Sequence, residues 1–188
     1  NNQFSFSSNN DFVHAKNLYK LGHFYAGYFT NELFNNAFLW ADSEKTLKLA
    51  LRNSIIIQSV IELKDAYSPN YGFSIYDLIS GAAGSYFHYI KKKSNKLNCI
   101  DIKFSYYKRS NKYWQLEKER GKLASGYEFF NDYVNQNYWL TCKLNKILDL
   151  EFFKNFNLAI GTGIDDSQFL NNSSIAVSYT HLTLPTST

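Results

Sequence analysis

The stretch that most constrains the fold runs over Ile55–Ile90 and reads IIIQSVIELKDAYSPNYGFSIYDLISGAAGSYFHYI. Two apolar segments of helical texture flank a break and turn at residues 68–74, and each segment carries acidic residues. Glu62 and Asp65 precede the break, and Asp77 follows it. An ionised group within apolar sequence costs free energy unless it is paired or hydrated. The stretch therefore predicts a helix–turn–helix unit whose acids face other polar groups.

Three helices are predicted in the first half of the chain, at about residues 11–38, 44–66 and 74–91. Asn10 or Asp11 would cap the first helix, and the turn at Ala41–Ser43 would lead into and cap the second. Ser74 would cap the third helix, with Asp77 three residues later as the acid of a capping box. Each predicted helix therefore begins with its own start signal.

Each predicted helix also carries one polar stripe. The stripes are Lys16, Lys20, His23, Gly27 and Thr30 or Asn31; Ser54, Gln58, Glu62 and Asp65; and Asp77, Gly81, Gly84 and His88. Spacings of three and four residues place each stripe on one helix face. We expect the three stripes to face one another, with the glycines permitting close helix approach. No helix carries the roughly 20 apolar residues of a membrane span, although interfacial insertion stays open.

The second half of the chain predicts strands. Ile100–Tyr106 alternates with period two, and Tyr138–Leu144 and Phe156–Gly163 are further strand candidates. Trp114–Leu123 could form a short surface helix. The predicted fold class is α+β: three packed N-terminal helices with an inward polar stripe, followed by a small antiparallel sheet or hairpins.

Composition places limits on domain organisation and partners. We expect a disordered lead-in at residues 1–10 and a single domain at 11–170, with a helical part at 11–93 and a strand-rich part at 97–165. The net charge of +4 is mild and dispersed, which argues against nucleic acid as a partner. The two cysteines, Cys99 and Cys142, could form a disulfide or simply pack, and the sequence leaves both open.

The C-terminal end looks artificial. The chain contains no Met, and Val177–Thr186 resembles a translated sequencing adapter. This resemblance predicts that residues 177–188 are a non-native tail on a fragment read from environmental DNA. Because we expect truncation at both ends, the sequence leaves open whether a signal peptide or lipid anchor precedes it.

An ordered set of short motifs resembles a known family. The set comprises Tyr19-Lys20-Leu21-Gly22-His23-Phe24, Glu62, Asp65-Ala66-Tyr67-Ser68-Pro69 and Gly72-Phe73-Ser74-Ile75-Tyr76-Asp77. It resembles the YfiM-like family of predicted periplasmic lipoproteins and outer-membrane-associated proteins, with Tyr19 in place of an Asp and Gly81 in place of an Asn. More distantly, the order of His, Glu and Asp over three helices is similar to VanZ-like membrane proteins. The resemblance implies a location in the bacterial cell envelope, periplasmic or associated with the outer membrane.

The candidate site residues are His23, Glu62, Asp65 and Asp77, and they have two interpretations. In one they form a metal site or an acid–base pair, with His23, Glu62 and Asp77 as ligands of Zn, Mn or Fe. In the other they form a structural network: Asp77 caps its helix, Glu62 pairs with Lys20 or His23, and Asp65 braces the following turn. The network is the favoured interpretation, with no firm catalytic residue and no cofactor.

The predicted function follows from the implied location. We expect a membrane-associated structural or binding component of the envelope, with the membrane surface or other envelope components as partners. The alternatives are an envelope metal-assisted hydrolase that uses the His/Glu/Asp cluster, and a binder of lipids or hydrophobic ligands. Lys91–Lys93 could contact anionic headgroups or end a helix in solvent, and Tyr138-Trp139 could lie in an aromatic belt or in the core.

Overall fold

The structure is a computed structural model that describes residues 3–7, 17–68, 72–111, 115, 118, 132–148, 150–164 and 181–183. The chain divides into two compact units, Asn1–Asn98 and Cys99–Thr188. The first unit contains the long helices and the second contains the sheet, so the predicted α+β class is confirmed. The single-domain interpretation stays a prediction.

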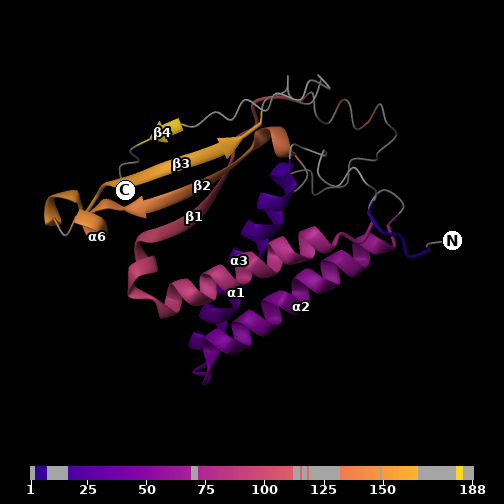
Figure 1. Cartoon of the computed structure of the whole chain (residues 1–188), viewed down its shortest axis with the longest axis horizontal. Coiled ribbons are helices and arrows are strands. Elements are labelled where there is room, and N and C mark those ends of the chain that lie inside the picture. Colours follow the sequence, from indigo (N-terminus) through magenta and orange to yellow (C-terminus); the bar gives the residue numbers. More distant parts are fainter. Residues whose placement is uncertain are drawn as a thin grey trace. The chain divides into compact units, whose positions relative to one another are not determined.

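The helical unit consists of α1 (Leu18–Trp40), α2 (Thr46–Ala66) and α3 (Ile75–Lys93) (Figure 1). Each of these helices packs against the other two. The predicted helices are therefore confirmed, with ends that differ by a few residues where both are described. None of the helices in the described ranges combines the length and the apolarity that crossing a membrane requires.

The three helix starts compare differently with the predicted caps. Asn17 precedes α1 in a left-handed conformation with φ 64°, and the predicted cap at residues 10–11 lies outside the described residues. Lys45 precedes α2, also left-handed with φ 58°, and makes no side-chain cap hydrogen bond. The predicted cap at Ala41–Ser43 is therefore wrong, because the chain leaves that turn through Lys45. Ser74 does cap α3, since its hydroxyl oxygen accepts the Asp77 N–H at 3.2 Å.

Glycines bring the helix backbones into direct contact. A Cβ added at Gly27 of α1 would overlap the carbonyl oxygen of Gly81 in α3. A Cβ added at Gly84 of α3 would overlap the carbonyl oxygen of Phe24 in α1. Because backbone meets backbone at both places, neither neighbour can yield as a flexible side chain would. The two glycines therefore set the distance between α1 and α3.

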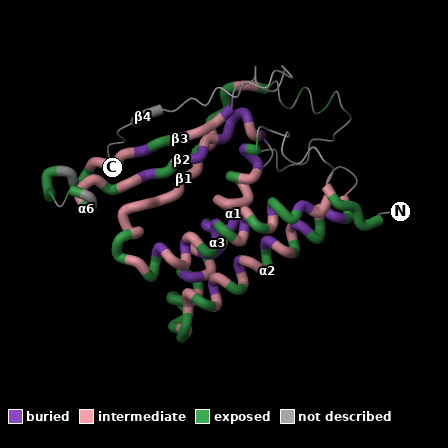
Figure 2. The backbone as a smooth tube through the Cα atoms, viewed as in Figure 1, coloured by how far each residue is buried: buried purple, intermediate pink, exposed green. Residues whose placement is uncertain are grey.

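Many of the side chains in the interior of the helical unit are polar, and many on its exterior are large and apolar; Figure 2 shows which stretches are buried and which are exposed. The buried polar side chains on the three helices are Asn31, Asn35, Ser54, Gln58, Glu62, Asp77, Ser85, His88 and Lys91. The exposed large apolar ones include Phe29, Leu33, Trp40, Ile56, Val60, Leu63, Ile75, Ile79 and Tyr86. This arrangement confirms the predicted inward polar stripe and reverses the usual amphipathic pattern of a water-soluble bundle.

The second unit contains an antiparallel sheet of order β1-β2-β3-β4. Its strands are β1 (Ile100–Tyr106), β2 (Gln136–Lys143), β3 (Asn157–Gly163) and the short β4 (His181–Thr183). The first three confirm the strand predictions. β4 falls in the adapter-like tail, whose interpretation stays a prediction, and the predicted helix at 114–123 lies outside the described residues except for residues 115 and 118.

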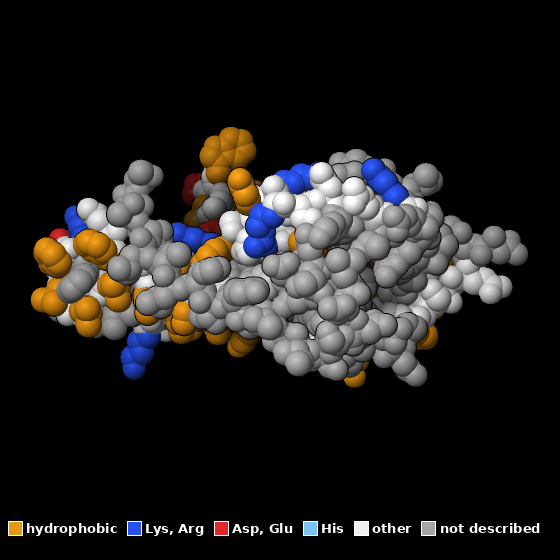
Figure 3. Space-filling model, turned by 90° about the horizontal axis from the view of Figure 1, so that it is seen from above, with side chains coloured by type: hydrophobic (Ala, Val, Ile, Leu, Met, Phe, Trp, Pro, Cys, Tyr) orange, Lys and Arg blue, Asp and Glu red, His pale blue; other side chains and the backbone are white. Residues whose placement is uncertain are grey.

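Short elements lie before or between the strands. η2 (Asn95–Cys99) precedes β1, η3 (Tyr133–Asn135) precedes β2, and α6 (Leu144–Leu148) and η4 (Glu151–Phe153) lie between β2 and β3. Figure 3 shows hydrophobic side chains gathered at the left-hand end of the view, where α6 lies in Figure 1. Leu148, Leu150 and Phe152 are exposed in this region.

Two open questions of the sequence fall in the sheet unit. Tyr138 is only 7% exposed and its hydroxyl donates to Gln136 Oε1 at 2.8 Å, so it belongs to the core of the sheet unit.

Cys99 and Cys142 are both free thiols. Burial, followed by the hydrogen bond with the Cys99 thiol, raises the pKa of Cys142 to about 11. The two cysteines are thus close neighbours, with Cys142 opposite Ile100 in the register.

Candidate functional site

Three of the predicted site residues converge inside the helical unit. His23 of α1, Glu62 of α2 and Asp77 of α3 each offer one ligand atom, and these atoms all lie within 4.8 Å of one another. His23 Nδ1 lies 3.4 Å from Glu62 Oε1, and His23 Nε2 lies 3.9 Å from Asp77 Oδ2. The fold therefore brings together residues that are far apart in the sequence. We call these three residues, with Lys20 and Asp65, the charged cluster.

Each carboxylate of this trio is oriented by a second group. Glu62 Oε2 accepts the backbone N–H of Ser74 at 3.2 Å. Asp77 Oδ1 lies 3.4 Å from Lys20 Nζ, which also donates to the Tyr19 hydroxyl at 2.7 Å. In both carboxylates the remaining oxygen is the one nearer His23. The two acids thus present one oxygen each to the same imidazole.

The capping box predicted for Ser74 and Asp77 is only half correct. Ser74 Oγ accepts from the Asp77 N–H as expected. The reciprocal bond to the Ser74 N–H, however, comes from Glu62 on a different helix. Glu62 is only 2% exposed because α2 packs it against the start of α3. Its capping role releases the Asp77 carboxylate to pair with Lys20.

Asp65 lies at the edge of the charged cluster. Burial raises the pKa of its carboxyl; Lys64 and His23 act in the opposite direction, and Asp77 raises it further. Its predicted role in bracing the following turn stays a prediction; the backbone carbonyl oxygen of Asp65 accepts the Ser68 N–H at 3.0 Å. The rest of that turn, residues 69–71, lies outside the described residues. Asp65 is therefore an electrostatic neighbour of the trio and is not one of its three close ligand atoms.

The charged cluster holds more negative than positive groups. Its five residues include three carboxylates, one lysine and one histidine, and Lys64 adds a positive charge beside Asp65; Glu62 and Asp77 are both buried. Buried negative charge is costly unless a cation compensates it. The cluster therefore favours the uptake of a cation, either a proton or a metal ion.

A second cluster, built from hydroxyl, amide and imidazole groups, lies in the same interior. The hydroxyls of Ser54 and Ser85 lie 2.7 Å apart, so that one donates to the other, and the remaining hydroxyl proton has backbone carbonyl oxygens within reach. Ser54 Oγ lies 3.0 Å from Gly27 O, and Ser85 Oγ lies 2.9 Å from Gly81 O and 3.2 Å from Gly27 O. Asn31 Nδ2 donates to the Ser85 carbonyl oxygen at 2.8 Å, and Asn31 Oδ1 lies 2.9 Å from His88 Nδ1. We call Asn31, Ser54, Ser85 and His88 the neutral cluster. Sequence reasoning put three of them on the polar stripes but missed Ser85, whose spacing of four from Gly81 was the available signal.

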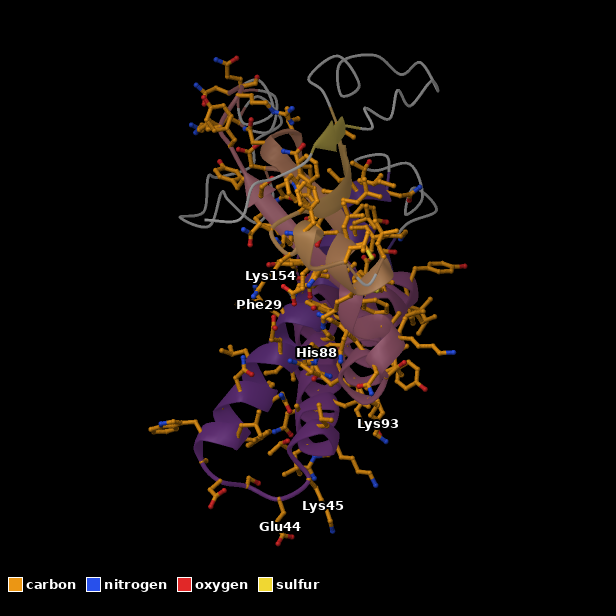
Figure 4. All side chains as sticks on the ribbon, turned by 90° about the vertical axis from the view of Figure 1, so that its left-hand side faces the viewer. Phe29, Glu44, Lys45, His88, Lys93 and Lys154 are labelled. Carbon is orange, nitrogen blue, oxygen red and sulfur yellow. The ribbon has the colours of Figure 1, made fainter. Side chains whose placement is uncertain are left out.

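The two clusters are layers of one stack. Asn31 lies eight residues after His23 on α1, and Ser85 lies eight residues after Asp77 on α3. Ser54 lies eight residues before Glu62 on α2. The residues midway are Gly27, Gln58 and Gly81, which contact one another closely enough that a Cβ on either glycine would clash. At about 1.5 Å per residue, the two clusters lie about 12 Å apart along the helices. Figure 4 shows His88 within the helical unit, whereas Lys93 and Glu44 lie at its outside.

Lys91 corrects a sequence prediction. It is 7% exposed, and its Nζ donates to the Tyr28 hydroxyl at 3.0 Å. The predicted contact of Lys91 with solvent or headgroups is therefore wrong, because its spacing of three from His88 turns it inward. Lys92 and Lys93 are exposed, so both contact with anionic headgroups and contact with solvent stay open for them.

These features define a class of protein: a three-helix unit with a layered polar interior, an apolar exterior and a charged cluster near the start of α3. Residues 10–93, which include all three helices, match the family model described as predicted periplasmic lipoprotein (DUF2279). This match supports a protein of the cell envelope on its periplasmic side. No curated protein and no solved structure matches the chain. The YfiM-like and VanZ-like resemblances and the outer-membrane association stay predictions.

Proposed function

We propose that the helical unit docks on the surface of a lipid membrane and acts there as a membrane-associated binding component of the envelope. The observation that carries this proposal is the apolar exterior of a unit whose interior is polar. The match to a family described as periplasmic lipoproteins supports it, since a lipid anchor holds a protein beside a membrane.

The outward apolar side chains follow the helix period. On α2 they are Ile56, Val60 and Leu63, at spacings of four and three, and each is at least half exposed. On α3, Ile75 and Ile79 are one turn apart and also more than half exposed. Apolar surface gains about 25 cal/mol for each Å² removed from water. Where exposed apolar side chains gather in a patch, they mark interaction sites more often than free surface.

A lipid surface fits this exterior better than a water-filled environment does. Trp40 is 91% exposed, and aromatic residues of this type favour the membrane interface. Lys92 and Lys93 are exposed at the end of α3, where they can contact anionic headgroups. Docking in the plane of the interface also requires no helix long enough to span the bilayer.

Co-sedimentation of the purified full chain with vesicles of phosphatidylethanolamine and phosphatidylglycerol tests the proposal. We expect the wild type to sediment with the vesicles and Val60→Glu to remain largely in the supernatant. Ile160→Glu is the matched control, because it places the same charge on an exposed apolar position of the sheet unit. It should sediment as the wild type does.

Two outcomes would overturn lipid docking. In one, the wild type stays in the supernatant. In the other, gel filtration shows a dimer that Val60→Glu dissociates while the vesicles remain unbound, which would assign the apolar exterior to self-association. Circular dichroism of each variant checks that the helices are retained.

A further inference from the structure

We propose that His23, Glu62 and Asp77 bind a divalent transition-metal ion, for which Zn²⁺ is the probe. This inference goes beyond membrane docking and does not depend on it. One ring nitrogen and one oxygen from each carboxylate would be the protein ligands, a set that suits Zn²⁺ and leaves a position for water. An ion held in this way is the one that the metal-assisted chemistry considered from the sequence would require.

The distances are near those of a bound ion. Zn²⁺ bonds of about 2.0–2.2 Å in a tetrahedral site place the ligand atoms about 3.4 Å apart. His23 Nδ1 and Glu62 Oε1 are already separated by 3.4 Å. The atoms of the trio all lie within 4.8 Å of one another, so the widest-spaced pair would close by up to about 1.4 Å in such a site. Because the three ligands come from three helices, the ion would also tie the helical unit together.

The carboxylates are already oriented for this role. Ser74 N–H holds Glu62 Oε2, and Lys20 Nζ holds Asp77 Oδ1. Partners of this kind fix the direction of metal ligands and raise the affinity of a site. Glu62 is also buried, which excludes competing water from most of its surface.

The charges around the trio are compatible with a divalent ion. An ion of charge +2 cancels the two ligand carboxylates, while Lys20 pairs with Asp77 and Lys64 interacts with Asp65. The acidic groups that interact with His23 are Glu62, Asp65 and Asp77. Proton and metal compete for the same imidazole, so the affinity for metal should fall as the pH is lowered.

Zn²⁺ titration of the full chain against a chromogenic chelator provides the test. The measurements use a Cys99→Ser, Cys142→Ser background, because two neighbouring thiols could bind Zn²⁺ themselves. We expect one equivalent to bind at pH 7.5, and less tightly at pH 6. His23→Gln, Glu62→Gln and Asp77→Asn should each weaken binding by at least about tenfold, which equals about 1.4 kcal/mol.

The control is Glu32→Gln, which removes an α1 carboxylate that is not among the three ligand atoms and should leave the affinity unchanged. A second readout is the melting temperature, which Zn²⁺ should raise in the wild type and not in Asp77→Asn. The proposal is overturned if the parent chain takes up no Zn²⁺, or if all three ligand variants bind it as tightly as the parent. Because no lipid is present, either result leaves membrane docking to its own test.

Discussion

The charged and neutral clusters occupy equivalent layers of the same three helices, yet they are built differently. The neutral cluster is closed by bonds of 2.7–3.2 Å, several of them to backbone carbonyl oxygens. The charged cluster instead brings ionisable side chains together, with His23 3.4 Å from Glu62 Oε1 and 3.9 Å from Asp77 Oδ2. Ionisable groups of this kind can bind or release a cation, whereas hydroxyls and amides cannot. We infer that the neutral layer holds the helices together and that the charged layer is arranged for a cation.

This difference also separates two kinds of buried polar residue. Ser54 and Ser85 are fully buried and share a carbonyl acceptor, so their hydrogen bonds need nothing from outside the protein. Glu62 and Asp77 carry charge that Lys20 only partly offsets. The predictions below are ordered by the size of the effect that this comparison implies.

The largest effect is expected at the contact between the two layers. Gly27→Ala should destabilise the helical unit by more than about 3 kcal/mol, because the added Cβ meets the Gly81 backbone and the Ser85 hydroxyl. Thermal unfolding followed by circular dichroism measures the change. Ala37→Gly, at an exposed position of α1, is the control and should cost about 1 kcal/mol. Equal stability of the two variants would show that α1 and α3 do not approach as described.

The next largest effect is expected in the neutral cluster. His88→Ala should cost about 2–4 kcal/mol, because it leaves a cavity and removes the imidazole bonded to Asn31. His88 is fully buried, so no water can replace the lost group without entering the interior. Urea unfolding gives the free-energy difference. A loss below about 0.5 kcal/mol would mean that this layer does not hold the helices.

A smaller effect is expected from Asp77→Asn in the charged cluster. In EDTA the variant should lose under about 1 kcal/mol, since the weakened pairing with Lys20 is offset by relief of carboxylate repulsion. In Zn²⁺ the gap between wild type and variant should widen, because only the wild type keeps all three ligands. Urea unfolding in both conditions measures it. If Asp77→Asn lowered the free energy of unfolding in EDTA as much as His88→Ala does, the claim that mainly the neutral cluster holds the helices together would be wrong.

The smallest effect is expected at Asp65. Its folded-state pKa lies above the ordinary value of 3.8, chiefly through burial, so the folded chain holds this proton more tightly than the unfolded chain. The free energy of unfolding therefore falls as the pH rises above 3.8 and Asp65 loses its proton. Asp65→Asn should raise the melting temperature at about pH 7, and by less at about pH 4. A gain that is equal at both pH values, or a loss at pH 7, would contradict the direction of the shift.

The polar interior shows how far local sequence signals reach. The spacing of Ser54, Gln58 and Glu62 predicted one inward face of α2, and all three are buried. The same logic placed His88 inward but assigned Lys91, one turn further on, to solvent or lipid. Charge outweighed periodicity in that prediction, whereas in the fold the Tyr28 hydroxyl provides the lysine with a partner.

The candidate site was predictable as a set of residues and only partly as a set of contacts. His23, Glu62 and Asp77 could be singled out because each is an ionisable group on a polar stripe. The sequence offered His23 as one of two partners for Glu62, and the two lie 3.4 Å apart, but it assigned to Asp77 the Ser74 N–H that Glu62 in fact caps. Which acid reaches which donor depends on the rotation and axial offset of two helices. A single sequence contains no signal for those two quantities.

The sequence by itself determined where the helices and strands lie and which face of each helix is polar, because periodicity and turn chemistry are local properties. It also identified the acidic residues of Ile55–Ile90 as the side chains that need polar or charged partners. Only the tertiary structure decided that these acids meet a histidine in one layer and that hydroxyls and amides close another layer about 12 Å away. The physical reason is the glycine contact between α1 and α3, which fixes the helix distance and offset and thereby selects the side chains that face one another.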